Sequence, residues 1–388
     1  MRINLEKIKV ILGCVGLSLF LHSTAIAESL PGTVLWKLDI GSAIWTPVKH
    51  DEGILYFGAD NGVLYALNSE SKRLIWEFKT DGLIRSGIEI VKGEIWFASD
   101  DGFLYSINSK TGKLIWKFDL ENLNLSRRLP AVEAPYEYDY LHSSPVYNNG
   151  LLYIGGLNGK LYALDSKTGK QRWFFQSQAK IRSTPVIHGR HVYFGSWDGK
   201  FYCLDSSTGQ KVWQFDSEGI IQDSPAIGGG QVFFGSRSTK FVALDEKTGK
   251  LNWQYIHKDG SWAESSPVYQ DGIVYVGSSD ALKLFAFNAK SGVVKWVFKT
   301  GGWSWGRPLL SNNKIYIGAI SASPYYFENV KLKSGIFSVD QQSGQLLWEQ
   351  NSKPVKGYVT GGFHAEGVVV SGVLYVGGID GTFYAYKA

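Results

Sequence analysis

The 388-residue chain has little cysteine, namely Cys14 and Cys203. Cys14 lies in an apolar N-terminal segment, so the remainder of the chain holds one cysteine, which excludes an intrachain disulfide and a cysteine-based metal site there. The chain also lacks adjacent cysteines, a C-x-x-C-H haem-attachment motif, an H-E-x-x-H motif, a phosphate-binding P-loop and a recognisable Ser-His-Asp pattern. The fold must therefore be stabilised by packing, and the common catalytic motifs are missing.

Neither sign of charge is in large excess. Beyond Ala27 the chain contains 37 basic and 34 acidic residues. This balance argues against nucleic acid or an anionic membrane as the main partner, because both require a concentrated basic surface. After Leu21 no apolar run is long enough to cross a bilayer. We therefore predict no nucleic-acid partner and no transmembrane segment.

The first 27 residues have the pattern of a secretory signal peptide. Basic residues precede an apolar run, Val10–Leu21, and Ala25-Ile26-Ala27 provides the small residues of a cleavage site. We predict cleavage after Ala27 and a periplasmic or secreted protein. Cys14 precedes most of the apolar run, so we interpret it as part of the removed signal and not as a lipid-attachment site. Residues 28–388 are predicted to form a single domain.

Tryptophan, in contrast, is abundant and periodic. Eight tryptophans form a series in which neighbours are 40, 40, 57, 40, 40, 43 and 52 residues apart. They are Trp36, Trp76, Trp116, Trp173, Trp213, Trp253, Trp296 and Trp348. A unit of about forty residues therefore recurs with three insertions, which indicates a solenoid or a propeller. Each unit contains four short runs rich in β-branched and aromatic residues. In the clearest unit they are Thr184–His188, His191–Gly195, Lys200–Leu204 and Gln210–Phe215, with a turn pair, Asp198-Gly199, in the middle.

Four antiparallel strands per unit, repeated eight times, predict an all-β, eight-bladed β-propeller. The last unit, Val373–Tyr386, ends before its tryptophan strand, whereas Thr33–Ile40 is a tryptophan strand with no unit before it. We predict that these two segments pair. The N-terminal strand would then complete the C-terminal blade and close the ring without an open sheet edge.

Several repeated residues are interpreted as structural. The copies ALDSKTGKQRW (163–173), CLDSSTGQKVW (203–213) and ALDEKTGKLNW (243–253) share an Asp that can cap the following turn and a Gly suited to positive φ. The tryptophans are predicted to dock between blades, with the indole N–H bonded to the neighbour. Cys203 occupies an Ala position of the other copies, so we predict a small buried side chain.

The motif A-x-D-x-x-T-G-x-x-x-W resembles the repeat of propellers of the pyrroloquinoline-quinone (PQQ) type. That family includes quinoprotein alcohol dehydrogenases and the propeller lipoprotein of the outer-membrane β-barrel assembly machine. The resemblance covers essentially all of residues 28–388 and implies the propeller fold. The dehydrogenases hold PQQ against a disulfide of adjacent cysteines and bind calcium through Glu, Asn and Asp. This sequence has no adjacent cysteines and no plain counterpart of the calcium site.

Function is expected where the blades differ. The insertions 119–142 and 319–335 are predicted to lie on one face of the ring, called here the insertion face, together with the variable turns 236–240 and 278–284. The residues before each innermost strand vary most. We predict that the following contact a ligand or partner at the channel mouth: Arg85, His142, Arg182, Gln222, Asp223, Glu264, Trp303, Trp305, Arg307 and His364. Loop aromatics expected to help are Tyr136, Tyr138, Tyr140, Tyr325 and Tyr326.

The sequence favours an exported binding or scaffold protein that holds a protein segment, a glycan or a small molecule on the insertion face. No cofactor or metal is expected. One alternative is a PQQ-dependent enzyme, with Arg85, Arg182 and Arg307 on the cofactor carboxylates and Trp303 or Trp305 on its ring. Another is a cofactor-free enzyme at the same mouth. The third is a solvated rim of ion pairs, such as Arg182 with Asp223 or Glu264.

Overall fold

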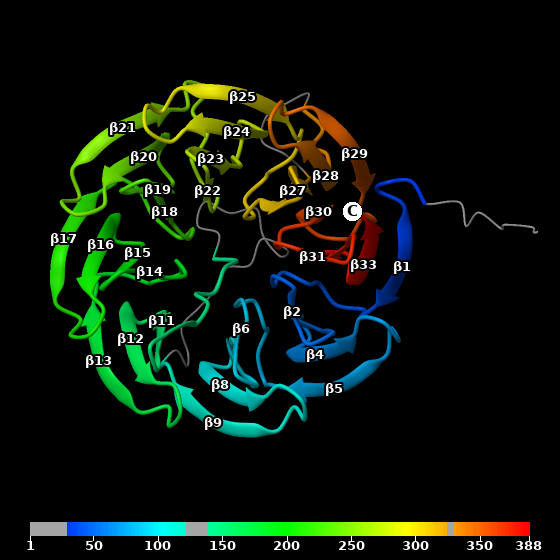
Figure 1. Ribbon diagram of the computed structural model, residues 1–388, viewed down its shortest axis with the longest axis horizontal. Helices are drawn as coiled ribbons and strands as arrows, with labels where there is room; N and C mark the ends of the chain where they lie inside the picture. Colours follow the sequence, from blue (N-terminus) through cyan, green and yellow to red (C-terminus); the bar gives the residue numbers. More distant parts are fainter. Residues whose placement is uncertain (1–28, 122–138, 324–329) are drawn as a thin grey trace, which may run out of the picture.

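The structure is a computed structural model that describes residues 29–121, 139–323 and 330–388. All regular elements in these ranges are β-strands, arranged as eight sheets around a central axis (Figure 1). The predicted all-β, eight-bladed propeller is therefore confirmed. In the described ranges there is no helix of the length and apolarity needed to span a membrane. The predicted signal segment, 1–27, lies outside them.

Seven blades use consecutive strands, from the innermost to the outermost. Blades 1 to 4 are β2 (Lys49–Asp51), β3 (Ile54–Gly58), β4 (Val63–Asn68), β5 (Leu74–Lys79); β6 (Glu89–Val91), β7 (Glu94–Ala98), β8 (Phe103–Asn108), β9 (Leu114–Asp119); β10 (Val146–Asn148), β11 (Leu151–Gly155), β12 (Lys160–Asp165), β13 (Gln171–Gln176); and β14 (Val186–His188), β15 (His191–Gly195), β16 (Lys200–Asp205), β17 (Lys211–Asp216). Blades 5 to 7 are β18 (Ala226–Gly228), β19 (Gln231–Gly235), β20 (Lys240–Asp245), β21 (Leu251–Ile256); β22 (Val268–Gln270), β23 (Ile273–Val276), β24 (Lys283–Asn288), β25 (Val294–Lys299); and β26 (Leu309–Ser311), β27 (Lys314–Ala322), β28 (Gly335–Asp340), β29 (Leu346–Asn351).

Blade 8 closes the ring with strands from both ends of the chain. Its order is β31 (Val368–Val370), β32 (Val373–Gly377), β33 (Thr382–Lys387) and β1 (Val34–Asp39). β1 and β33 lie side by side as antiparallel neighbours, with Lys37 opposite Tyr384 (Figure 1). The predicted closure is therefore confirmed: the first and last strands of the chain are hydrogen-bonded to each other.

The insertion in blade 7 lengthens β27 beyond its blade. The far end of β27 pairs with β30 (Val359–Gly362), which belongs to the link between blades 7 and 8. Ile320 of this extension also forms a β-bridge with Trp303. The extension therefore holds the Trp303 segment against the insertion-face end of the channel.

Five of the repeated tryptophans make the predicted indole hydrogen bond to the next blade, whereas the N–H groups of Trp296 and Trp348 are buried without a partner among the described residues. The Trp173 indole donates to the Ser206 carbonyl of the next blade at 3.2 Å. Gly209 of that blade has φ +73°, and a Cβ there would lie 2.6 Å from the Trp173 ring, so only glycine fits between ring and turn. Asp205 caps the same turn by accepting the Thr208 N–H at 3.1 Å. The same indole-to-carbonyl bond is made by Trp76, Trp116, Trp213 and Trp253.

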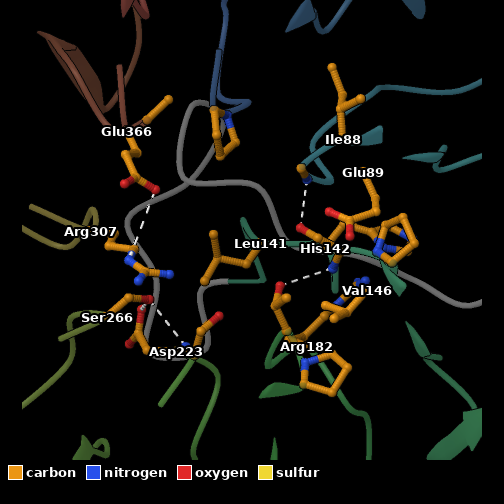
Figure 2. A pocket seen from close by; sticks show the side chains of 18 of the residues that line it. Ile88, Glu89, Leu141, His142, Val146, Arg182, Asp223, Ser266, Arg307 and Glu366 are labelled. Atoms are coloured by element: carbon orange, nitrogen blue, oxygen red, sulfur yellow. Dashed lines mark hydrogen bonds and ion pairs between the residues drawn. The ribbon is translucent and has the colours of Figure 1, made fainter. Parts of the chain in front are cut away.

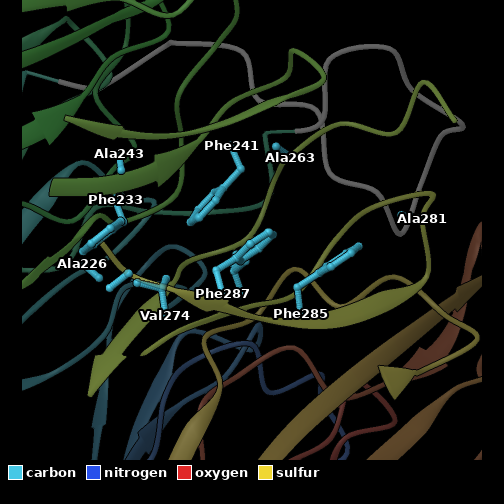
Figure 3. Close-up of a cluster of buried hydrophobic side chains, with 11 residues drawn as sticks. Ala226, Phe233, Phe241, Ala243, Ala263, Val274, Ala281, Phe285 and Phe287 are labelled. Atoms are coloured by element: carbon cyan, nitrogen blue, oxygen red, sulfur yellow. The ribbon is translucent and has the colours of Figure 1, made fainter. Parts of the chain in front are cut away.

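Apolar clusters between adjacent blades form the core. Figure 3 shows one of them, in which Phe233 and Phe241 of blade 5 face Phe285 and Phe287 of blade 6. The rings of Phe241 and Phe287 stack at 5.5 Å. Because side chains alternate across a twisted sheet, each blade presents apolar residues to both neighbours, and the ring has no single centre of packing. Cys203 is fully buried in the cluster between blades 4 and 5, as predicted.

Two local features differ from expectation. β14 begins at Val186 and not at Thr184, because Pro185 has no N–H to donate and the Thr184 hydroxyl accepts the Ser144 N–H instead. In the Asp198-Gly199 turn only Gly199 has positive φ, at +80°. Asp198 instead caps the turn with its carboxylate, which accepts the Lys200 N–H at 2.9 Å.

Candidate functional site: the central channel and the insertion face

The residues that precede the innermost strands converge at the insertion-face end of the channel. Those predicted to contact a ligand are almost completely buried there, with exposed fractions of 8% or less: Arg85, His142, Arg182, Gln222, Asp223, Glu264, Trp303, Trp305 and His364. Arg307 differs, with 45% of its side chain exposed. The structure thus brings the predicted residues together, but as a packed layer and not as an open rim.

Tyr140 lies on the axis of the ring. Its fully buried phenol stacks on Trp305 with ring centroids 4.9 Å apart, and its edge meets His364 at 5.3 Å. Its hydroxyl donates to the Glu264 carboxylate at 3.2 Å, and its carbonyl accepts from Arg85 at 3.4 Å. Tyr140 therefore contacts residues from four separate points around the ring, whereas the sequence suggested a loop aromatic available to a partner.

A stack of aromatic rings closes this end of the channel. Trp303 and Trp305 are nearly parallel, with centroids 4.6 Å apart. Trp45 packs against Tyr140 at 6.1 Å. All four rings are at most 2% exposed. We call these four residues the central aromatic cluster.

The two buried arginines that were predicted to contact a ligand are already paired. Arg85 binds both carboxylate oxygens of Asp60 at 2.8 and 2.6 Å, and Arg182 binds both of Asp139 at 2.6 and 2.8 Å. Lys180 adds a longer contact to Asp139 at 3.3 Å. The expected partners of Arg182 were Asp223 or Glu264. Asp139 takes this place because the end of the first insertion returns into the channel beside blade 4.

Glu264 and Asp223 form a buried acidic pair next to Tyr140. Glu264 accepts from Gln222 and from Arg237, the latter at 3.2 Å, so its charge is neutralised locally. Asp223 accepts from the Ser266 hydroxyl at 3.4 Å. Burial, and then the charge of Glu264, raise the pKa of Asp223 well above its ordinary value. Asp223 therefore retains its proton in conditions where an exposed aspartate has lost it.

The protonation of Asp223 predicts a pH dependence of stability. Because its pKa is raised in the folded state, its contribution is fully present below the ordinary value near 3.8 and is lost as the pH rises through the folded-state value. We expect Asp223→Asn, which can still accept from Ser266, to raise the midpoint of thermal unfolding at pH 8 and leave it nearly unchanged at pH 3.5. Asp165→Asn is the control of opposite sign, since Arg172 lowers the pKa of Asp165 to about 2. A lower midpoint for Asp223→Asn at pH 8 would contradict the assignment.

Below the aromatic cluster, hydroxyl groups link the blades around the channel. The Ser144 hydroxyl accepts the Gly87 N–H at 2.6 Å, and the Thr184 hydroxyl accepts the Ser144 N–H at 3.0 Å. Ser266 accepts the Ser224 N–H in the same way at 3.1 Å. Ser144, Thr184 and Ser266 each precede a proline at the same position of the repeat, so this position links neighbouring blades around the channel.

A cavity of about 430 Å³ occupies the channel beyond this layer. Its inner end is formed by buried residues such as Arg182 and Trp305, and its outer part by residues on the innermost strands such as Glu89 and Asn148. Exposure increases toward the ends of β14, β18 and β22, where the last residues of β14 and β22, His188 and Gln270, are exposed. Since the strands run away from the insertions, the cavity opens on the opposite face.

Comparisons with known proteins give the family. The chain matches the family model described as outer membrane protein assembly factor BamB over residues 24–141, 132–259 and 202–322. The chain belongs to the BamB family. No curated protein sequence matches it.

Solved structures show the same fold at low sequence identity. BamB from Moraxella catarrhalis is 17% identical, with a TM-score of 0.68 over 92% of this chain and 100% of that one. A quinohemoprotein alcohol dehydrogenase from Comamonas testosteroni is 15% identical, with a TM-score of 0.68 over 91% and 76%. Sqt1 from Saccharomyces cerevisiae is 11% identical, with a TM-score of 0.71 over 92% and 100%. At these identities the likeness concerns the fold alone.

The channel of this BamB-family chain does not fit PQQ in the way that the alternative of a PQQ-dependent enzyme requires. A flat quinone needs a free aromatic face, but Trp305 is stacked against both Trp303 and Tyr140 and is 1% exposed. The arginines proposed for its carboxylates, Arg85 and Arg182, are bound to Asp60 and Asp139. In the described part of the chain, no three His, Cys, Asp or Glu side chains are close enough to hold a metal ion.

On the insertion face, over blades 4 to 6, two partly exposed tryptophans pack against the partly exposed Lys180 and the buried Arg237, whose side chain is 4% exposed. Lys180 lies 4.7 Å from the Trp197 ring centroid, and the Arg237 guanidinium lies 5.2 Å from Trp197 and 5.3 Å from Trp262. Both tryptophans remain partly exposed. Tryptophan and arginine are the residues most enriched at the energetic centres of protein interfaces.

The sequence interpretation missed Asp60, Asp139, Trp197 and Arg237. A signal was present for three of them, since Asp60, Trp197 and Arg237 occupy the same position of the second-to-third-strand turns of blades 1, 4 and 5, where the residue type changes from blade to blade. This turn position pairs with the next link, because Asp60 binds Arg85 and Arg237 binds Glu264. The predicted aromatics Tyr136, Tyr138, Tyr325 and Tyr326 lie outside the described residues.

Proposed function

We propose that this chain is an exported, protein-binding scaffold of the cell envelope that takes part in outer-membrane protein assembly. The observation that carries the proposal is the match of residues 24–322 to a family described as an assembly factor of outer-membrane proteins. The N-terminal segment is consistent with export, because it combines basic residues, an apolar run and Ala25-Ile26-Ala27.

The charged groups of the channel are consistent with a binding role. At the insertion-face end they are engaged with one another, as in the pairs Arg182–Asp139 and Arg237–Glu264. They rigidify the centre of the ring. A rigid ring presents its surface groups at fixed distances, which lowers the entropic cost of binding a partner.

We place the partner surface on the insertion face over blades 4 to 6. Trp197 and Trp262 provide apolar area at low entropic cost, Lys180 provides a partly exposed cation, and the buried Arg237 packs against both tryptophan rings. The partner that fits this surface is a folded protein domain with apolar and acidic side chains. Arg237 is held by Glu264, so the surface is connected to the packed centre of the ring.

The test is capture of envelope proteins by the purified, tagged chain after cross-linking. We expect Trp197→Ala with Trp262→Ala to reduce the recovery of specifically captured proteins by about tenfold or more, the usual effect of removing two central interface residues. Phe174→Ala, which removes an aromatic 47% exposed on the outer wall of blade 3, is the matched control. Equal recovery with the double variant would exclude this surface, and failure to capture outer-membrane assembly components with any variant would exclude the proposed function.

A further inference from the structure

The cavity on the face opposite the insertions has features that the protein-binding proposal does not use. It has a volume of about 430 Å³, within the range of pockets that hold small molecules. It is closed at its inner end by the central aromatic cluster, so an extended chain cannot pass through it. A ligand of this cavity must therefore be compact.

The charges that line the cavity are balanced. At the outer end, Lys49 and Arg307 are matched by Glu89 and Glu366, and Arg307 lies 4.0 Å from Glu366. At the inner end, Arg85 and Arg182 are neutralised by their bidentate aspartate partners. In Figure 2, Arg307 and Glu366 lie on one side of the cavity and Glu89, His142 and Arg182 on the other, with Leu141 between them. A cavity without net charge gives no electrostatic preference for an ion.

Hydrogen-bonding groups are nevertheless abundant around the wall. The hydroxyls of Ser144 and Thr184 each accept a backbone N–H, and among the described residues neither has an acceptor for its own proton. The Ser224 hydroxyl makes no hydrogen bond to the described residues. All three line the cavity, on consecutive blades 3, 4 and 5. Across the cavity, the Glu366 carboxylate can accept and the Arg307 guanidinium can donate.

Apolar side chains lie between these polar groups. Leu141, Val146 and Ile187 also line the cavity. The wall therefore alternates hydroxyls, carboxylates and guanidinium groups with short aliphatic surfaces. A molecule that matches this wall must be neutral, carry many groups able both to donate and to accept hydrogen bonds, and expose C–H surface between them. Sugars have this combination.

We propose that the cavity is a binding site for a small neutral carbohydrate, of mono- or disaccharide size, on the face opposite the insertions. The ligand hydroxyls accept from Ser144, Thr184 and Ser224 and from Arg307, and donate to Glu366. The aliphatic wall packs against the C–H face of the ring. This site is independent of the proposed protein partner, which binds the other face.

The proposal is tested by saturation-transfer NMR and calorimetry of the purified chain with glucose, N-acetylglucosamine and maltose, and with phosphate and glutamate as charged probes. We expect at least one saccharide to bind saturably and to exceed both charged probes in affinity. Arg307→Ala should weaken binding by about tenfold or more, because it removes a charge-assisted donor. Ser224→Phe, which fills the cavity, should abolish it, and Phe174→Ala on the outer wall should leave it unchanged.

Arg307 is 45% exposed and the Ser224 hydroxyl makes no hydrogen bond to the described residues, so both variants are expected to fold, and this is checked by far-ultraviolet circular dichroism and thermal unfolding. Absence of saccharide binding to the folded chain would overturn the proposal, as would a crystal structure grown with saturating sugar that shows ordered water alone. Stronger binding of phosphate or glutamate would overturn it in favour of an ion site. These measurements use the isolated chain, so a negative result here is distinct from a failure to capture protein partners.

Discussion

Asp139→Ala is expected to lower the free energy of unfolding by about 3–5 kcal/mol. The reason is the charge that remains. Arg182 and Asp139 are each 1% exposed, so removing the carboxylate takes two bonds, at 2.6 and 2.8 Å, and the opposite charge from a buried guanidinium. The measurement is urea unfolding followed by tryptophan fluorescence, with the midpoint and slope compared between variants.

Two controls separate this effect from a general loss of ion pairing. Arg172→Ala breaks a surface pair with Asp165 of similar length, 2.7 Å, but Arg172 is 60% exposed, and we expect a loss of about 1 kcal/mol or less. The double variant Asp139→Leu with Arg182→Met removes both charges and should recover most of the stability. A double variant as unstable as Asp139→Ala would show that packing, and not the buried charge, is responsible.

Tyr140→Ala is expected to cost about 3–5 kcal/mol, the usual result of deleting a large buried aromatic side chain. The phenol is fully buried on the axis and stacks on Trp305, so its removal leaves a void that rigid blades cannot fill by moving inward. The outer strands and their tryptophan contacts do not depend on it. We therefore expect native far-ultraviolet circular dichroism with a lower unfolding midpoint.

Tyr140→Phe provides the matched control. It preserves the stacking and removes the hydroxyl that donates to Glu264 at 3.2 Å, so the expected cost is about 1.5–3 kcal/mol, typical of a hydrogen bond to a charged group. Equal losses for the two variants would assign the whole effect to the hydroxyl. A Tyr140→Ala variant as stable as the wild type would mean that Tyr140 does not fill the channel.

The fold could be predicted from the sequence because its determinants are local and repeated. Trp173, Gly209 and Asp205 recur at fixed spacing, and each acts on a neighbour one unit away, so the spacing alone predicts the contact. Ring closure could also be predicted, because the lone strand Val34–Asp39 and the incomplete last unit each lack what the other provides.

The site could be predicted only in part. Alignment of the blades identified the positions that converge on the channel, including Arg85, Arg182 and Glu264. It did not identify their partners, because these come from the turn of the preceding blade, as Arg237 does for Glu264, or from an insertion, as Asp139 does for Arg182. No repeat position corresponds to Asp139.

The sequence by itself determined the number of blades, their order, the closure of the ring and the repeat positions that converge on its centre, because each of these follows from contacts between adjacent repeats. Only the tertiary structure decided that the centre is closed on the insertion face and that the cavity opens on the other. That outcome depends on where Tyr140 lies, a single residue at the end of a non-repeated segment. Its position results from simultaneous packing against residues more than a hundred positions apart, such as Glu264, and periodicity carries no information about such contacts.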